Sequence, residues 1–332
     1  MTPVVSVIMP VRDGGPFLAQ AVSSILGQTF SDFELLIVDD HSEDGAVRAL
    51  PRDDSRLKVV KSRGRGVSVA FNTGMEQAAG QFIARMDADD IALPMRFEQQ
   101  LAYLESHAEV AICGACVEIF ADHPIAGGNR RYQTWLNDCR TPEAIRRELY
   151  IESPIPNPTA LFRRGALEKL GGYADPEWPE DYDLFLRADA AGMKMGKPDG
   201  VLLRWREHDQ RLTRTDQRYS LGRFQAAKLH YLAASRLTAD VPLLIWGAGP
   251  TGALTHDLLQ GEGVAIGGFL EIHPRRIGGR KRNLPVYGLE HLHEDDRSFV
   301  LAAVGSAGAR ENIRAFMNSV GRIEGEHYLF VA

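Results

Sequence analysis

The fold is decided by the stretch "VVSVIMPVRDGGPFLAQAVSSILGQTFSDFELLIVDD", which runs from Val4 to Asp40. Residues 4–10 form a short apolar, largely β-branched run, which predicts a strand. Behind a Gly-Gly turn, residues 16–28 carry apolar side chains at helical spacing, and residues 33–40 form a second apolar run that ends in two aspartates. A strand, a helix and a strand in this order predict an α/β fold with a parallel sheet covered on both faces.

The same alternation continues along the chain. Further strands are predicted over 56–60 and 81–87, and helices over 66–80 and 94–107. An irregular exposed loop is predicted over 122–135. It is followed by a strand and a helix over 157–173 and by an amphipathic helix over 178–192. The segment 201–216 begins as an apolar strand and ends in a cluster of arginines with one histidine. We expect one domain over 1–218, a helical linker over 219–238, and a smaller doubly wound domain over 239–332.

The composition of the 332-residue chain is ordinary, with a net charge of -6 and a pI near 6.0. This balance gives no general attraction to nucleic acid, so no polynucleotide partner is expected. No apolar run reaches the length of a transmembrane helix, and no signal-peptide pattern precedes the first strand. These features predict a cytoplasmic protein with at most peripheral contact at the inner face of the membrane. The three cysteines, two of them in "CGAC" (113–116), are expected to be buried small hydrophobic side chains.

Acidic residues follow the second and fourth predicted strands. In open α/β sheets ligands bind outside the carboxyl ends of the strands, so these acids should meet at one edge. The acidic residues after the fourth predicted strand lie in "ARMDADDIALP" (84–94). Mg²⁺ and Mn²⁺ take one or two carboxylates and complete their shell with substrate phosphate oxygens and water. Asp87, Asp89 and Asp90 therefore predict a divalent cation site that a diphosphate completes.

Three segments, in this order and spacing, resemble family 2 glycosyltransferases with the GT-A fold: "VSVIMPVRDGGPFLAQAVSSILGQTFSDFELLIVDDHSEDGA", "ARMDADDIALPMRFEQQ" and "WPEDYDLFLR". The resemblance covers about residues 4 to 216. It implies an inverting, metal-dependent hexosyltransferase that moves a sugar from a nucleotide-sugar donor to a hydroxyl acceptor. The donor that the family usually uses, and that is expected here, is a UDP-sugar. The implied process is polysaccharide or glycoconjugate synthesis, the cofactor Mn²⁺ or Mg²⁺, and the acceptor a saccharide or lipid-linked saccharide.

The resemblance also assigns roles to single residues of the first domain. It places Pro10, Val11 and Arg12 along the nucleobase, Asp39 in a hydrogen bond with it, Asp87 near the ribose, Asp89 and His208 on the metal, and Arg206 near the diphosphate. Asp181 of "WPEDYD" corresponds to the catalytic base, which takes the proton of the acceptor hydroxyl while the cation stabilises the departing diphosphate. Asp90 is expected to hold the acidic loop.

The sequence departs from the family pattern at two places. Arg12-Asp13 stands where many members have Tyr-Asn, which leaves stacking of the base on an aromatic ring open. Phe71 stands where many members have arginine, and the contact of that arginine would pass to Arg63 or Arg65 or be absent.

The second domain opens with "GAGPTG", in which Gly247, Gly249 and Gly252 follow a predicted strand and begin a helix. Glu271 lies at the end of the next strand, at the spacing of a dinucleotide-binding fingerprint. The domain is similar to the small Rossmann-like domains that precede some sugar acyltransferases, with "GFLEIHPRRIGG" and "LPVYG" in matching places. The second domain could bind a nucleotide or sugar ligand, or it could have a packing role, and the sequence leaves both possibilities open.

Two other classes of function compete with sugar transfer. A nicotinamide-dependent oxidoreductase could use the second domain, but the chain shows no Tyr-x-x-x-Lys pair for it. A non-catalytic nucleotide-sugar binding protein would keep the donor site without turnover. A nucleotidyltransferase would need a glycine-rich basic loop after the first strand, and "PVRDGGPFL" has no following Arg/Lys pair.

Overall fold

The structure, a computed structural model, describes residues 2–125, 127–237, 240–294, 297–306 and 308–332. The chain divides into two compact units: Met1–Arg146 with Pro154–Asp216, and Arg147–Ser153 with Gln217–Ala332. Residues 147–153, which the sequence assigns to the first domain, thus group with the second unit. The predicted boundary between linker and second domain, at residues 238 and 239, lies outside the described residues and stays a prediction.

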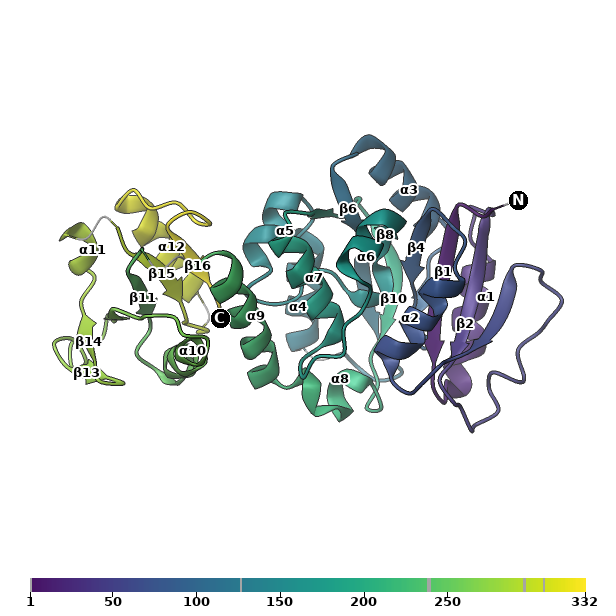
Figure 1. The fold of residues 1–332 in the computed structure, drawn as a ribbon, viewed down its shortest axis with the longest axis horizontal. Coiled ribbons are helices and arrows are strands. Elements are labelled where there is room, and N and C mark those ends of the chain that lie inside the picture. The colour runs from purple at the N-terminus through teal and green to yellow at the C-terminus, as the bar shows by residue number, and fades with distance from the viewer. Residues whose placement is uncertain (1, 126, 238–239, 295–296, 307) are drawn as a thin grey trace. The chain divides into compact units, whose positions relative to one another are not determined.

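A seven-stranded sheet forms the centre of the first unit (Figure 1). In spatial order its strands are β3 (Leu57–Lys61), β2 (Phe33–Asp39), β1 (Val5–Val11), β4 (Phe82–Arg85), β8 (Leu161–Arg163), β6 (Val110–Cys113) and β9 (Lys194–Gly196). The four strands from β3 to β4 are parallel, so their carboxyl ends share one edge, and the predicted mixed α/β fold is confirmed.

One strand of this sheet differs from the expected parallel arrangement. β8 runs antiparallel to both β4 and β6. The chain re-enters the sheet beside the carboxyl end of β4, where Arg85 N donates to Ala160 O, just after the 3-10 turn η2 (Asn157–Thr159). A strand that starts at that edge can only run back against β4.

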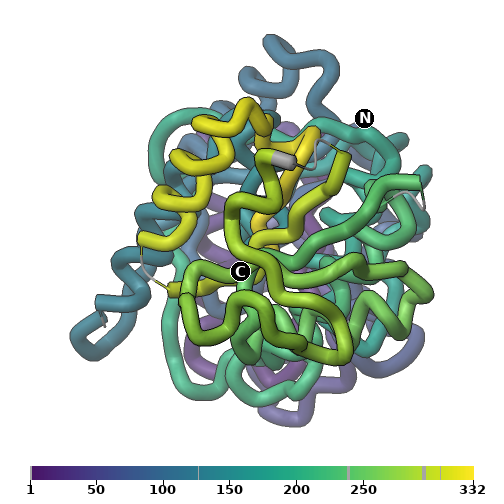
Figure 2. Tube along the Cα trace, turned by 90° about the vertical axis from the view of Figure 1, so that its left-hand side faces the viewer, coloured from purple at the N-terminus to yellow at the C-terminus, as the bar shows by residue number. Residues whose placement is uncertain are grey.

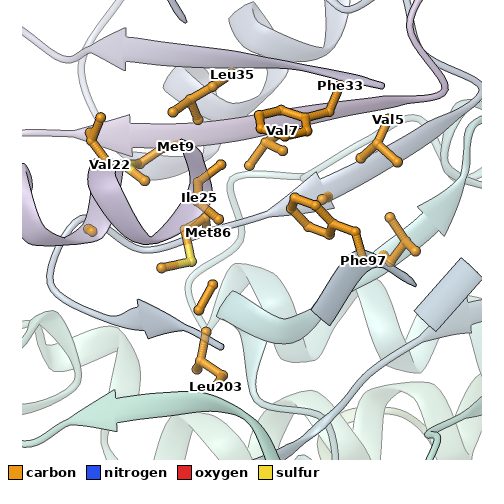
Figure 3. Packing of buried hydrophobic residues seen from close by; sticks show 14 of the residues in the cluster. Val5, Val7, Met9, Val22, Ile25, Phe33, Leu35, Met86, Phe97 and Leu203 are labelled. Atoms are coloured by element: carbon orange, nitrogen blue, oxygen red, sulfur yellow. The ribbon is translucent and has the colours of Figure 1, made fainter. Parts of the chain in front are cut away.

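Helices flank the strands of the first unit. They are α1 (Leu18–Leu26), α2 (Val67–Gln77), α3 (Arg96–Ser106), α4 (Gly127–Asp138), α5 (Pro142–Glu148), α6 (Arg164–Leu170), α7 (Glu180–Ala190) and α8 (Leu212–Thr215), with the 3-10 turn η1 (Gly15–Phe17). Figure 3 shows the core between α1 and the sheet, where Val7 and Met9 of β1 lie near Val22 and Ile25 of α1 and Val5 lies farther along the strand. Side chains alternate along a strand, and the opposite face of β1 and β2 packs against α2.

The prediction of an irregular loop over 122–135 is wrong for most of its length, because α4 begins at Gly127. Tyr132, Trp135 and Leu136 have helical spacing, and Leu136 is buried. The glycine pair before them concealed this spacing. Asn137 of α4 also accepts from Val117 N and donates to Val117 O, at 2.9 and 2.8 Å, so the helix completes the edge of a strand.

A second, three-stranded sheet brings a distant segment to the acidic loop. It consists of β5 (Ile91–Ala92), β10 (Val201–Arg206) and β7 (Cys116–Phe120). β10 pairs antiparallel with β5 and parallel with β7. Because β5 follows Asp90 directly, the residues that end β10 lie beside the aspartates.

The second unit contains a six-stranded sheet, parallel except for one edge hairpin. Its strands are β13 (Arg280–Lys281), β14 (Leu284–Tyr287), β12 (Gly268–Leu270), β11 (Leu243–Trp246), β15 (Phe299–Ala302) and β16 (Tyr328–Phe330). The helices are α9 (Leu221–Ser235), α10 (Pro250–Gly261), α11 (His291–Glu294) and α12 (Ala309–Ser319), with the 3-10 turn η3 (Gln217–Tyr219). Figure 2 shows α12, in yellow, along one side of this unit. Its residues Ile313 and Met317 belong to the same buried core as Leu244 and Trp246.

Residues 147–153 belong to the second unit through a buried amine. Lys228 of α9 donates to Ile151 O and to Val331 O, both at 2.9 Å. Burial lowers the pKa of Lys228 to about 8. One side chain therefore joins α9, this segment and the end of the last strand.

Two other predictions from the sequence can be compared with the structure. Cys113, Cys116 and Cys139 are buried, as expected, and none of these three described residues forms a disulfide. In the part of the chain that the structure describes, no helix has both the length and the apolar character needed to cross a bilayer.

Candidate active site

The loops after β1 and β2 are bound to each other at the carboxyl edge of the sheet. Asp40 N donates to Val11 O at 2.7 Å, which extends the pairing of the two strands. Asp13 Oδ1 accepts from Glu43 N at 2.7 Å, and Asp13 itself has a left-handed backbone with φ of 51°. Backbone hydrogen bonds from Glu43 and Asp44 lower the pKa of Asp13. The two loops thus form one fixed wall of the site.

The two aspartates after β2 have different hydrogen-bond partners. Asp39, the expected partner of the nucleobase, accepts from Ser42 N at 2.9 Å. Asp40 is 4% exposed and accepts from Gly66 N at 2.9 Å through Oδ2. Among the described residues, its other oxygen, Oδ1, is buried and has no hydrogen-bond donor. A buried acceptor without a donor is costly, which makes Asp40 the better candidate to bind a ligand N–H.

The remaining expected donor-binding residues differ in exposure. Pro10 is half-buried and Val11 is buried on β1, whereas Arg12 is exposed in the loop that follows β1. Arg65 is exposed just before α2, and Arg63 forms an ion pair with Glu76 at 2.5 Å. Arg65 is therefore the freer candidate of the two to replace the arginine that the family pattern has at Phe71.

The three aspartates of the acidic loop converge. One carboxylate oxygen from each of Asp87, Asp89 and Asp90 lies within 4.8 Å of the others. Asp87 Oδ1 is 2.5 Å from Arg85 Nη2, and the Arg85 side chain is 4% exposed. Burial raises the pKa of Asp87, while Arg85 opposes that shift. Arg85 was not singled out from the sequence, because nothing in a single arginine within a strand indicates that its side chain turns to the strand end.

The residues after β10 close the acidic loop from the other side. Asp90 is 1% exposed, and its Oδ1 accepts from Arg206 N at 2.8 Å, which is the loop-holding contact expected for Asp90. His208 Nε2 lies 2.9 Å from Asp89 Oδ2, so the two expected metal ligands are adjacent. The Arg206 side chain donates to Asp89 O at 2.8 Å and to Gln20 Oε1 at 2.6 Å.

Arg206 is also enclosed by aromatic rings, with its guanidinium carbon 4.4 Å from the Phe17 ring centroid and 4.5 Å from that of Phe120. Cation–π contacts of this kind hold the guanidinium in place. Together with its hydrogen bonds to the acidic loop, these contacts let Arg206 hold that loop in position. The sequence predicted only a contact of Arg206 with the diphosphate.

The residues present fit a divalent cation. In the described part of the chain, Asp90 Oδ2 is buried and accepts no hydrogen bond, although it belongs to a group of three converging carboxylates. Burial, together with the like charges of Asp89 and Asp87, raises the pKa of Asp90 well above its ordinary value. A bound cation would satisfy this oxygen and remove the repulsion. The donor set of carboxylates and one imidazole suits Mg²⁺ or Mn²⁺.

A fully buried arginine lies beneath the acidic loop. Arg96 of α3 donates to Arg85 O at 2.8 Å and to Gln100 Oε1 at 3.1 Å. Gln100 in turn donates to backbone oxygens of Cys113, Gly114 and Thr159. Burial lowers the pKa of Arg96 to about 9, against the opposite effect of Asp90. This Arg96–Gln100 pair fixes the end of β4 to the ends of β6 and η2.

Asp181, the expected base, lies in the first turn of α7 next to the buried Glu180. Burial first, and the charge of Glu180 second, raise the pKa of Asp181 to about 8; Asp87 contributes in the same direction. The electrostatic contribution of Asp87 indicates that the acidic loop and the start of α7 are near each other. Perturbed carboxyl groups of this kind are frequent at active sites.

Tyr173 and Asn157 form a further wall that the sequence did not reveal. Tyr173 Oη donates to Asn157 Oδ1 at 2.5 Å, and its ring centroid is 4.3 Å from that of Phe71. Burial raises the pKa of Tyr173 well above its ordinary value, with a smaller contribution from Asp181. Phe71, in place of the family's arginine, thus packs against an aromatic residue of this wall.

In the second unit, the three glycines of the predicted fingerprint have different surroundings. Gly247 has φ of 115°, and a Cβ at Gly252 would lie 1.8 Å from Gly247 O, so both are required by the fold itself. A Cβ at Gly249 would meet no atom within 4 Å. Glu271 accepts from Ile272 N at 3.0 Å and from Arg276 Nη1 at 2.8 Å. Burial opposes ionisation of Glu271, but these hydrogen bonds outweigh it and lower the pKa.

Comparison with known proteins adds to this geometry. The model of a family described as glycosyl transferase family 2 matches residues 6–171. The putative glycosyltransferase EpsE of Bacillus subtilis is 28% identical, over 75% of this chain and 88% of EpsE. The amylovoran biosynthesis glycosyltransferase AmsE of Erwinia amylovora is 31% identical, over 57% of this chain and 70% of AmsE. The crystal structure of S. aureus TarS in complex with UDP-GlcNAc has a TM-score of 0.57 and 17% identity, over 77% of this chain and 70% of that one, which shows a shared fold.

Proposed function

The chain belongs to glycosyl transferase family 2, and from this premise we propose that it transfers a sugar from a nucleoside-diphosphate donor to a hydroxyl of a saccharide acceptor. The convergence of Asp87, Asp89 and Asp90 at the carboxyl edge of a parallel sheet carries the proposal. The relative AmsE is named for amylovoran biosynthesis, and we assign this chain likewise to polysaccharide synthesis. A lipid-linked acceptor and action at the inner face of the membrane stay predictions.

Asp181 is the proposed base. Its carboxylate takes the proton of the acceptor hydroxyl while that oxygen forms a bond to the anomeric carbon of the donor sugar. The bond from that carbon to the diphosphate oxygen breaks, and its electron pair leaves with the diphosphate. A single displacement of this kind inverts the anomeric centre. The raised pKa of Asp181, about 8, suits a group that must hold the proton it has taken.

A cation bound at the acidic loop would supply positive charge to offset the negative charge of the departing diphosphate. The residues that would hold it are Asp89 and His208, with the unpaired oxygen of Asp90 as a third donor. Arg206 keeps this set in place, because it donates from its backbone to Asp90 and from its side chain to Asp89 O. Asp87, paired with Arg85, is left to contact the ribose.

We assign base recognition to Asp40 in addition to the predicted contacts, which involve Pro10, Val11, Arg12, Asp39 and Arg65. The unpaired Oδ1 of Asp40 is an acceptor, and a carboxylate acceptor pairs with the ring N–H of uracil or guanine. The expected donor is a UDP-sugar. Because Asp40 Oδ1 has no donor among the described residues, it would gain a hydrogen bond when the base binds, which contributes to affinity.

The test is the thermal stability of the purified chain with UDP, GDP and dTDP, each with and without Mn²⁺. A ligand that binds the native state raises the melting temperature. UDP with Mn²⁺ should give the largest rise, and Asp89→Asn should remove the part that depends on Mn²⁺. The matched control is Asp199→Asn, which changes an aspartate whose side chain is 90% exposed. No stabilisation by any of the three nucleotides would refute the proposal.

A second measurement separates an enzyme from a binding protein. Asp181→Asn should keep the stabilisation by UDP and Mn²⁺ but lose release of UDP from a UDP-sugar. Turnover that is equal in wild type and Asp181→Asn would exclude Asp181 as the base. Because both oxygens of Glu271 already accept hydrogen bonds within its own loop, no observation favours the nicotinamide-dependent alternative.

A further inference from the structure

The second unit carries a strongly basic, exposed segment, which we call the basic loop (residues 272–283). It contains Arg275, Arg276, Arg280, Lys281 and Arg282 and no acidic residue, although the net charge of the whole chain is -6. All nine residues from 272 to 280 are exposed. The basic loop therefore presents a local positive potential on a chain that is otherwise acidic.

The backbone of the basic loop is held in one conformation. Gly278 N donates to Val286 O at 2.9 Å, and Val286 N donates to Gly279 O at 3.1 Å. Strands β13 and β14 then form a hairpin at the edge of the sheet (Figure 1), with Arg282 and Asn283 at its turn and φ of 51° and 62°. A fixed backbone presents the charges without a large ordering cost on binding.

Three of the five cations are available to a partner. Arg276 pairs with Glu271 at 2.8 Å and Arg282 with Asp257 at 2.5 Å. In the ranges that the structure describes, Arg275, Arg280 and Lys281 form no ion pair. Arg280 does donate a hydrogen bond to Asn283 O in the hairpin turn, but this contact leaves its positive charge without a carboxylate partner among the described residues.

Apolar side chains in the same loop indicate the kind of partner. Ile272 is 67% exposed and Ile277 is 36% exposed. Cationic residues beside exposed aliphatic side chains are typical of surfaces that bind anionic lipid, where charges contact headgroups and apolar groups enter the interface. Binding of single-stranded nucleic acid commonly uses aromatic stacking, and residues 272–283 contain no aromatic ring apart from His273.

We propose that the basic loop is a docking surface for an anionic phospholipid bilayer. Arg275, Arg280 and Lys281 contact lipid phosphates, and Ile272 inserts at the level of the headgroups. The second unit then contributes membrane attachment. This proposal does not rest on the sugar transfer proposed above, because lipid binding can be measured without a nucleotide.

The experiment is co-sedimentation of the full chain with phosphatidylcholine vesicles, with and without phosphatidylglycerol. The chain should bind only the anionic vesicles, and added salt should release it. One cation near the surface contributes about a fivefold factor in binding, so Arg275→Gln/Arg280→Gln/Lys281→Gln should lower the partition coefficient by about 100-fold. Ile272→Ser should lower it by about tenfold.

The matched control removes three exposed charges from the first unit, in Arg48→Gln/Lys169→Gln/Lys194→Gln. It has the same net charge as the first variant and should bind anionic vesicles like wild type. Equal binding to neutral vesicles, or an equal loss in the control, would overturn the proposal. So would tighter binding of a labelled oligonucleotide than of vesicles, since that result assigns the basic loop to nucleic acid. Melting curves of all variants establish that they are folded.

Discussion

Replacing Gly252 with alanine should destabilise the second unit while leaving the first unit unchanged. The added Cβ would lie 1.8 Å from Gly247 O, so that distance must widen by more than 1 Å. Gly247 cannot withdraw freely, because its N–H donates to Leu270 O at 2.8 Å and Val304 lies close behind it. Overpacking with a backbone shift costs about 1–3 kcal/mol, and a weakened hydrogen bond about 1 kcal/mol more. Alanine regains about 1 kcal/mol of helix propensity.

The net loss is therefore about 1–3 kcal/mol, which lowers the melting temperature of a unit of this size by about 4–12 °C. The matched control is Gly249→Ala, where φ is -80° and the new Cβ has no neighbour within 4 Å; its stability should change by less than about 0.5 kcal/mol. Hydrogen exchange followed by mass spectrometry assigns the loss to peptides of either unit. Equal stability of Gly252→Ala and wild type, or an equal loss in Gly249→Ala, would refute the packing argument.

Three more outcomes are expected. Arg96→Met should lower the free energy of unfolding by about 3 kcal/mol in urea titration, because it leaves Arg85 O without its buried donor; an unchanged midpoint would contradict the role of Arg96. The pH profile of kcat/KM should rise with pH through about 8, since Asp181 acts only when deprotonated, and Glu180→Gln should move that rise to lower pH; identical profiles would exclude the coupling. Cys113, buried with its pKa raised to about 12, should react with a thiol reagent only upon unfolding, and rapid labelling of the native chain would count against the core packing described here.

The fold of the first unit was predictable where local patterns and sheet topology agree. The apolar runs of β1, β2 and β4 and the helices between them fix a parallel order, so convergence of the strand ends follows from chain direction alone. The antiparallel direction of β8 and the helix α4 did not follow, because the first depends on where the chain re-enters the sheet and the second on three apolar residues that follow two glycines.

The candidate site was predictable in its residue types more than in its contacts. Proximity of His208 to Asp89 follows from the resemblance, but only the coordinates distinguish Asp40 from Asp39, because the difference is whether a buried oxygen has a donor. Arg96 and Arg85 carry no sequence signal at all. Their importance comes from complete burial next to carboxylates, a property of tertiary packing.

The pairing of β5 with β10 has a consequence for the order of events on the ribosome. Arg206 N and Asp90 Oδ1 are 116 residues apart, so at ordinary rates of translation on the order of ten seconds passes between synthesis of the acidic loop and arrival of the strand that closes it. During that interval a nascent chain has its three carboxylates but neither the histidine nor the backbone donor that fixes Asp90. Competence to bind a cation with all four side chains is thus acquired late in the synthesis of the first unit, when β10 leaves the exit tunnel.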